Sequence, residues 1–308
     1  KIQVVVCPPF IFFEKLQNEP HFVPDPQLDC ERSMGQIVKD ISWIQAARLF
    51  FQARRDDLKL KEPPIPFGFP FVVGDRAERR FLSHSFPAVS VERMKGYARA
   101  RGASFNDLLN TLFAHAVYAR FSPGRAKPLL YFNAIDLRRY SRAVRKIEGP
   151  RNLSTFAVFK VIPAENADFD SLLKTFSDRV KLLRRASAIG LGGYFQLKLL
   201  NFIPNRLLTQ KLEKKWKKYE PYVKKGIFIP SPILLSSVGK IDEKRLSFPG
   251  AEVLEARMLP PVFDNWCFFV YSSYRDAVTV SVGFCDPEKM EPLLREIFEA
   301  IDQKIQTF

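Results

Sequence analysis

The stretch SVERMKGYARARGASFNDLLNTLFAHAVYARF, residues 90–121, decides the fold. It predicts two consecutive helices, 91–101 and 104–121, which meet at Gly102. A glycine directly after a helical segment is typical of a helix end, because it adopts the left-handed backbone that closes the last turn. The stretch therefore predicts a short helix, a tight break and a longer helix.

Polar residues at the start of each helix predict how the helices begin. Ser90 is placed to cap the first helix, and Ser104 the second, with Asp107 three residues later in a capping-box arrangement. Apolar side chains recur at helical spacing in the second helix, at positions 105, 108, 109, 112, 113, 116 and 117. We expect this helix to bury one face.

Strands and helices alternate around this pair. Strands are expected at 79–86, 128–137, 152–163, 232–238, 252–259, 266–274 and 277–284, and further helices at 41–56, 168–186 and 287–305. Asp168 or Asp170 opens one of these helices, and residues 276–279 fall in a hairpin turn. The pattern predicts an α+β fold, with helices packed on a mixed β-sheet.

Proline content divides the chain. Residues 62–70, EPPIPFGFP, hold four prolines, which neither a helix nor a central strand accepts. We expect a semi-rigid linker at 61–75 between residues 1–60 and a larger domain at 76–308. Residues 1–33 show no clear period.

Composition excludes several classes of protein. Of the 308 residues 46% are hydrophobic and 26% charged, which excludes wholesale disorder. The four cysteines are scattered without a CxxC pair, so we expect no zinc ribbon, no metal site and a reducing, cytoplasmic location. No apolar run reaches the roughly 18 residues that span a bilayer.

The charge is concentrated in one segment. The chain carries +15, and residues 184–226 hold 11 Lys and Arg against two Glu. Most of the segment, 191–225, is expected to be helical. Its basic surface includes Lys211, Lys214, Lys215, Lys217 and Lys218. Three interpretations stay open: peripheral contact with an anionic membrane, attraction of the phosphates of CoA or of an acyl-carrier protein, and a solvated helix packed on its own domain. Nucleic acid is not favoured, because no known binding motif accompanies the charge.

Four stretches together resemble one family, the condensation-domain and CoA-dependent acyltransferase superfamily, which includes chloramphenicol acetyltransferase. They are the helix pair 90–121, FNAIDLRRY at 132–140, NLSTFAVFKV at 152–161 and SSVGKIDEKRLSFPG at 236–250. The resemblance covers about three quarters of the chain. It implies a chloramphenicol-acetyltransferase-like lobe at 76–308, a mixed sheet covered by helices, and a partial N-terminal lobe at 1–60.

The resemblance also implies a catalytic motif, His-His-x-x-x-Asp-Gly, whose second histidine acts as general base. This sequence holds only three, unpaired histidines. The best alignment places Asp40 at the motif aspartate, with Gly35 and Gln36 at the two histidine positions. Glutamine does not take up a proton at neutral pH, so the motif is degenerate on this alignment. A truncated or frameshifted product and a genuinely degenerate member explain this equally well.

The resemblance further implies roles for single residues. Asp40 and Arg138 are expected to form an ion pair near the active site, and Asn152, Ser154, Ser236 and Ser237 to line the substrate tunnel, where the last two would donate hydrogen bonds to an oxyanion. The alternatives are unrelated surface charges and ordinary strand residues. For His84 and His115 we expect structural roles.

The expected activity is transfer of an acyl group from CoA or a carrier thioester to an alcohol or amine, without a bound cofactor. The thioester would be a co-substrate and an acyl-carrier protein a partner. The alternative is a non-catalytic member that binds a carrier protein or an anionic membrane surface.

Overall fold

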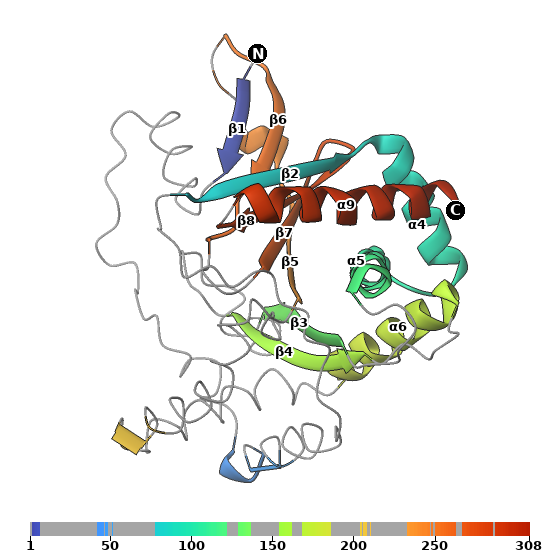
Figure 1. The fold of residues 1–308 in the computed structure, drawn as a ribbon, viewed down its shortest axis with the longest axis vertical. Helices are drawn as coiled ribbons and strands as arrows, with labels where there is room; N and C mark the ends of the chain where they lie inside the picture. The colour runs from blue at the N-terminus through green and yellow to red at the C-terminus, as the bar shows by residue number, and fades with distance from the viewer. Residues whose placement is uncertain are drawn as a thin grey trace.

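The computed structural model describes part of the chain in a defined position (Figure 1). The described residues are 2–6, 42–45, 47–48, 51, 78–121, 129–136, 154–161, 168–185, 204, 206–207, 210, 233–246, 248, 250–262, 267–285 and 287–308.

A six-stranded sheet is the centre of the fold. Its strands are β2 (Arg80–Phe86), β3 (Leu129–Asp136), β4 (Ser154–Val161), β5 (Ile233–Lys240), β7 (Cys267–Tyr274) and β8 (Ala277–Phe284). They lie in the order β2-β8-β7-β5-β3-β4. Strands β3, β5 and β7 run parallel, and the remaining pairs are antiparallel. The predicted mixed sheet is therefore confirmed.

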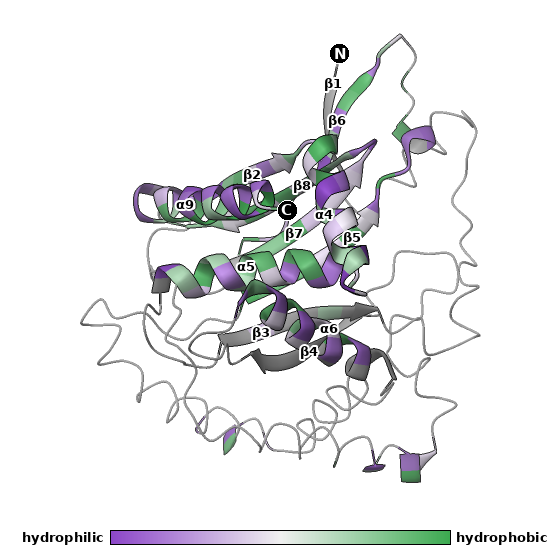
Figure 2. Ribbon diagram, turned by 90° about the vertical axis from the view of Figure 1, so that its right-hand side faces the viewer, coloured by the Kyte–Doolittle hydropathy of each residue, from purple (hydrophilic) through white to green (hydrophobic). Residues whose placement is uncertain are grey.

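In the part of the chain that the structure describes, four helices pack on one face of this sheet: α4 (Ala88–Ala100), α5 (Phe105–Phe121), α6 (Phe169–Arg185) and α9 (Pro287–Gln306). Helix α5 lies between α9 and α6, and it also contacts α4 (Figures 1 and 2). The core between helices and sheet takes alternate residues of the strands, such as Val278, Val280 and Val282 of β8. The α+β lobe is confirmed.

The ends of the helix pair form as the sequence predicts. Gly102 has φ of 62° and ends α4. The amide of Ala103 donates to the Ala98 carbonyl, as in a Schellman motif. Ser104 and Asp107 exchange side chain–backbone hydrogen bonds of 3.2 and 2.9 Å, which confirms the capping box.

Two local predictions are wrong. Ser90 lies inside α4 rather than capping it, because the helix begins at Ala88 and Pro87 takes the N-cap position, with its carbonyl accepting from the Val91 amide. Proline has φ already fixed, which suits this position. The hairpin turn falls at Arg275 and Asp276, so residues 277–279, predicted to lie in the turn, belong to β8.

Asp168 proves to be the residue that opens α6. Its carboxylate accepts a hydrogen bond of 2.7 Å from the Ser171 amide, as an N-cap does. Asp170, the other residue predicted for this role, lies in the first turn and instead binds the side chains of Tyr97 on α4 and of Arg101, the C-cap residue of that helix.

A strand that the sequence did not indicate lies near the N-terminus. Strand β1 (Ile2–Val6) pairs in parallel with β6 (Val253–Met258), forming a second, two-stranded sheet. Residues 43–45, 47, 48 and 51 are helical, within the predicted helix 41–56. The predicted linker 61–75 lies outside the described residues, and the predicted boundary between 1–60 and 76–308 stays a prediction.

Candidate functional site

Two neighbouring hollows of about 490 and 340 Å³ lie beside α4, and Lys95 and Phe105 line both of them. The smaller hollow reaches the carboxyl ends of β5 and β7. The larger is also lined by Glu92, Ala98, Arg99, Ala103 and Ser104, and the smaller by Val91, Gly239, Lys240, Tyr271, Ser273, Arg275, Asp276 and Val278. We call the two hollows together the α4 groove. The carboxyl edge of parallel strands is where α/β sheets commonly bind ligands.

A β-bulge in β5 turns one lysine toward the α4 groove. Ser237 lies opposite Tyr271, but the pairing then shifts at Val238, so that Lys240 lies opposite Ser273. Tyr271 belongs to the helix-facing core, and side chains alternate along a strand, so Ser273 and Lys240 face the same side. Without the extra residue Lys240 would face away. Gly239, with φ of 88°, supplies the backbone that the bulge requires.

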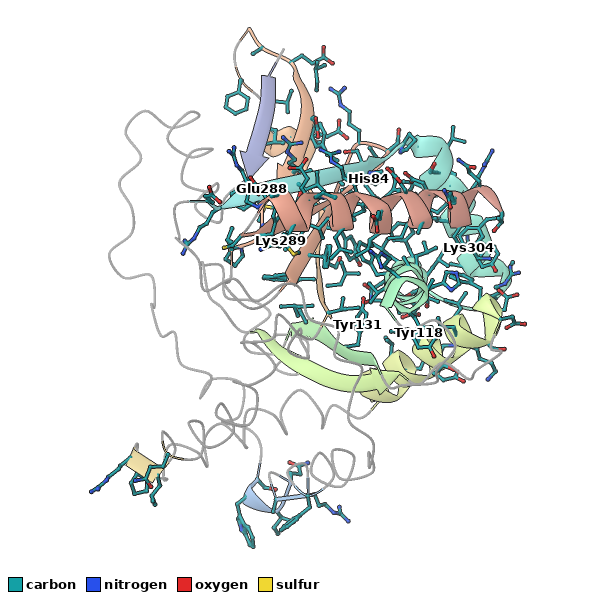
Figure 3. All side chains as sticks on the ribbon, in the orientation of Figure 1. His84, Tyr118, Tyr131, Glu288, Lys289 and Lys304 are labelled. Atoms are coloured by element: carbon teal, nitrogen blue, oxygen red, sulfur yellow. The ribbon has the colours of Figure 1, made fainter. Side chains whose placement is uncertain are left out.

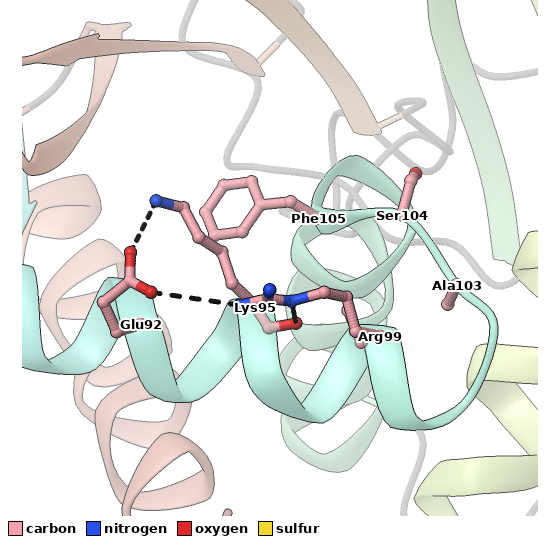
Figure 4. Close-up of a pocket in the computed structure, with 7 residues that line it drawn as sticks. Glu92, Lys95, Arg99, Ala103, Ser104 and Phe105 are labelled. Atoms are coloured by element: carbon pink, nitrogen blue, oxygen red, sulfur yellow. Dashed lines mark hydrogen bonds and ion pairs between the residues drawn. The ribbon is translucent and has the colours of Figure 1, made fainter.

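The α4 wall of the groove carries a cluster of charges. Glu92 lies 2.7 Å from the Lys95 ammonium and 4.0 Å from the Arg99 guanidinium (Figure 4). The guanidinium also donates through Nε to the Lys95 carbonyl at 3.3 Å. The hydrogen bond from Lys95 lowers the pKa of the Glu92 carboxyl, so Glu92 is an anion at neutral pH. All three side chains reach solvent.

Across the groove from α4, Arg275 forms ion pairs with two glutamates. Arg275, in the β7–β8 turn, lies 3.1 Å from Glu252 and 3.7 Å from Glu243. The hydrogen bond to Glu252 raises the pKa of Arg275. Among the described residues, four cationic side chains and two carboxylates line the α4 groove. The groove is thus suited to an anion of modest charge.

The floor of the groove connects to a buried polar network. The Tyr271 hydroxyl donates to Asn106 Oδ1 at 2.6 Å, and Asn110 Nδ2 donates to the Asn106 carbonyl at 2.6 Å. Asn110 is fully buried, and in the described part of the chain its Oδ1 has no hydrogen-bond partner. These contacts hold the start of α5 against the sheet. Phe105, Val91 and Val278 give the groove apolar walls beside its charges.

The sheet register brings three of the predicted tunnel residues to the same edge. Ser236 is half-buried and Ser237 is exposed at the carboxyl end of β5, on opposite faces of the strand. Ser154 begins β4 and lies opposite Asp136, at the carboxyl end of β3. Because β3 and β5 run parallel, these ends meet at one edge of the sheet, which is the edge of the α4 groove.

The other predicted site residues lie outside the described residues. They are Gly35, Gln36, Asp40, Arg138, Asn152, Lys211, Lys214, Lys215, Lys217 and Lys218. No motif in the sequence singles out Lys95, Arg99 or Lys240, which line the α4 groove. The i, i+4 spacing of the first two was visible, but the position of Lys240 depends on the bulge.

The two described histidines have structural contacts. His84 stacks on Phe298 of α9 and lies 3.0 Å from Asp302, which joins the edge strand β2 to that helix (Figure 3). His115 packs edge-on against Phe169, and its burial, with the nearby Lys304, lowers its pKa. Both histidines therefore make packing contacts, and His84 also a polar contact, of the kind expected for a structural role.

Among the described residues no cluster of His, Cys, Asp or Glu has the arrangement of a metal site. In the same part of the chain, no helix combines the length and the hydrophobicity needed to cross a membrane.

Solved structures have a similar fold. The cyclization-docking bidomain EpoB from Sorangium cellulosum is 12% identical, with a TM-score of 0.58, covering 96% of this chain and 56% of that one. The epimerization domain from the third module of tyrocidine synthetase B is 15% identical, with a TM-score of 0.58 and coverages of 99% and 67%.

An acyltransferase is also similar. Trichothecene 15-O-acetyltransferase from Fusarium sporotrichioides is 12% identical, with a TM-score of 0.50 and coverages of 86% and 54%. The chain therefore has the fold that these cyclization, epimerization and acetyltransferase proteins share. It spans between about half and two thirds of the length of these three proteins. No protein-family model matches the sequence, and no curated protein matches it either.

Proposed function

We propose that this chain takes part in acyl transfer, and that the α4 groove binds the anionic arm of an acyl thioester. The observation that carries the proposal is the α4 groove itself, a mixed charged and apolar groove at the carboxyl edge of a sheet with the condensation-domain fold. The acyl group would come from CoA or a carrier thioester and pass to an alcohol or amine.

The groove offers the two kinds of contact that such a donor needs. CoA and the arm of a carrier protein both join a phosphate ester to a long chain of amides and methylenes. Lys95, Arg99 and Lys240 line the groove and would bind the phosphate as charged hydrogen-bond donors. Phe105, Val91 and the other apolar walls would cover the chain.

The reacting end of the donor would lie toward the edge formed by β3 and β5. There the hydroxyl of Ser236 or that of Ser237, which lie on opposite faces of β5, is a candidate to stabilise the oxyanion of the tetrahedral intermediate, with Ser154 and Asn152 beside the acceptor. The hypothesis includes two further predictions about the active site. Asp40 and Arg138 form an ion pair there, and Gly35 and Gln36 occupy the positions of the two motif histidines. A cytoplasmic location, and a role of the basic segment 191–225 toward a carrier protein or membrane, remain predictions.

Binding of CoA to single-residue variants tests the groove directly. We expect Lys95→Ala and Lys240→Ala each to weaken CoA binding about tenfold, since each removes one charged hydrogen bond. Lys174→Ala is the matched control, because Lys174 is an exposed lysine of α6 paired with Asp178 at 2.9 Å, outside the groove. Isothermal titration calorimetry gives the dissociation constant of CoA for the parent protein and for the three variants.

Turnover is measured in the same samples from the release of free thiol, with acetyl-CoA and a panel of alcohols and amines. CoA binding that is absent, or unaffected by either groove substitution, contradicts the proposal. Acyl transfer above the uncatalysed rate that falls with both substitutions supports it.

A further inference from the structure

The α4 groove already contains an anion of its own, the Glu92 carboxylate. It lies between the two cations of the α4 wall, 2.7 Å from Lys95 and 4.0 Å from Arg99. The spacing i, i+3 and i+7 places all three side chains on one face of the helix. Figure 4 shows the carboxylate with dashed contacts to both cations. A ligand phosphate that binds here meets cations that are already partly neutralised.

Glu92 and Lys95 have unequal access to the two hollows of the groove. Lys95 lines both, whereas Glu92 lines only the larger one. Lys95 is about half exposed, and its four-carbon stem is flexible. Its ammonium is therefore able to reach either Glu92, as in the structure, or an anion in the smaller hollow, where Lys240 lies.

We propose that Glu92 is a built-in competitor that sets the affinity of the α4 groove for phosphate. With the groove empty, the carboxylate holds Lys95 and Arg99 in place. When a thioester donor binds, its phosphate takes Lys95 from Glu92, and the remaining repulsion between the two anions limits the affinity. This inference rests on the proposed function, and it identifies Glu92 as a residue that determines specificity and speeds release of the spent donor.

Charge count supports this role. Among the described residues that line the groove, the cations exceed the carboxylates by two, and Arg275 is itself paired with Glu252 and Glu243. Neutralising Glu92 therefore changes a large share of the net charge that a ligand meets. From Coulomb's law in a water-like dielectric, removal of one charge at roughly 5–7 Å from a phosphate changes affinity about three- to tenfold.

The test is Glu92→Gln, which keeps the shape of the side chain and removes its charge. We expect it to tighten CoA binding about three- to tenfold at low ionic strength, with a slower dissociation rate and a smaller gain at high salt. Binding of pantetheine, which has no phosphate, is expected to stay unchanged. Glu291→Gln is the matched control, because Glu291 forms an equivalent exposed ion pair with Arg295 on α9.

The outcomes separate this inference from the proposed function. Unchanged or weaker CoA binding by Glu92→Gln overturns the inference, and so does an equal gain for pantetheine, since that gain is not electrostatic. Lys95→Ala in the same titrations tests the groove independently: if it weakens CoA binding while Glu92→Gln has no effect, only the competitor role is lost. If Lys95→Ala also has no effect, the proposed groove function fails as well.

Discussion

Gly239 controls which way Lys240 faces, and its replacement by alanine tests that reasoning. Its φ of 88° lies in a region that residues with a Cβ disfavour, at a cost of about 1–2 kcal/mol. A Cβ placed on Gly239 meets no atom within 4 Å, so the cost is conformational and not steric. We therefore expect Gly239→Ala to lower the free energy of unfolding by about 1–2 kcal/mol.

A glycine on α4 gives a control of opposite sign. Gly96 lies inside the helix, and an added Cβ there also meets nothing within 4 Å. Gly96→Ala should raise the stability by about 0.5–1 kcal/mol, because glycine loses more backbone entropy than alanine in a helix. Urea unfolding followed by circular dichroism measures both variants.

The same variant also tests whether the bulge matters for CoA binding. If Gly239→Ala removes the bulge, Lys240 turns away from the α4 groove, and CoA binding should weaken as it does in Lys240→Ala. A Gly239→Ala protein that is as stable as the parent refutes the assigned backbone strain. A variant that unfolds more easily but binds CoA normally has kept the bulge at the cost of strain, whereas one that has lost the bulge and still binds CoA normally refutes the link between the bulge and the groove.

Two further predictions concern the helix pair and its surroundings. Ser104→Ala should cost about 1 kcal/mol in urea unfolding because it breaks the capping box, whereas Ser90→Ala, inside α4, should change little; equal effects would contradict the observed helix starts. Hydrogen bonds from Arg101 and then Tyr97 lower the pKa of Asp170 below 3.8, so this carboxylate stabilises the fold above about pH 4 and the contribution disappears as the pH falls through the folded-state pKa. In Asp170→Asn the urea midpoint should therefore fall less steeply with decreasing pH than in the parent, between pH 6 and pH 2.5. The same pH dependence in both proteins would contradict the ion pair.

The sequence predicted helix α5 and misjudged its surroundings. Its apolar stripe was found, but residues 107–114 are all buried, including Asp107, Asn110 and Thr111. The periodic spacing of apolar residues identifies one buried face of a helix. It does not show that three other helices and the sheet enclose α5, because those contacts come from distant parts of the chain.

Strand β1 was missed for a similar reason. A segment of five residues carries too little pattern to be distinguished from irregular chain, and its partner β6 lies some 250 residues away in sequence. The start of α4 was misplaced because Ser90 has the chemistry of a cap, while Pro87 takes the N-cap position with a suitable fixed φ and no side-chain cap hydrogen bond.

The sequence by itself determined the elements and their ends: Gly102 and the Ser104–Asp107 box act within a few residues, so local chemistry is sufficient. Only the tertiary structure decided the α4 groove. Lys95 and Lys240 are separated by 145 positions, and they line the same groove because two parallel strands end beside α4 and a bulge reverses the side chains of β5. Register and bulges depend on pairing between remote segments, which no local pattern encodes.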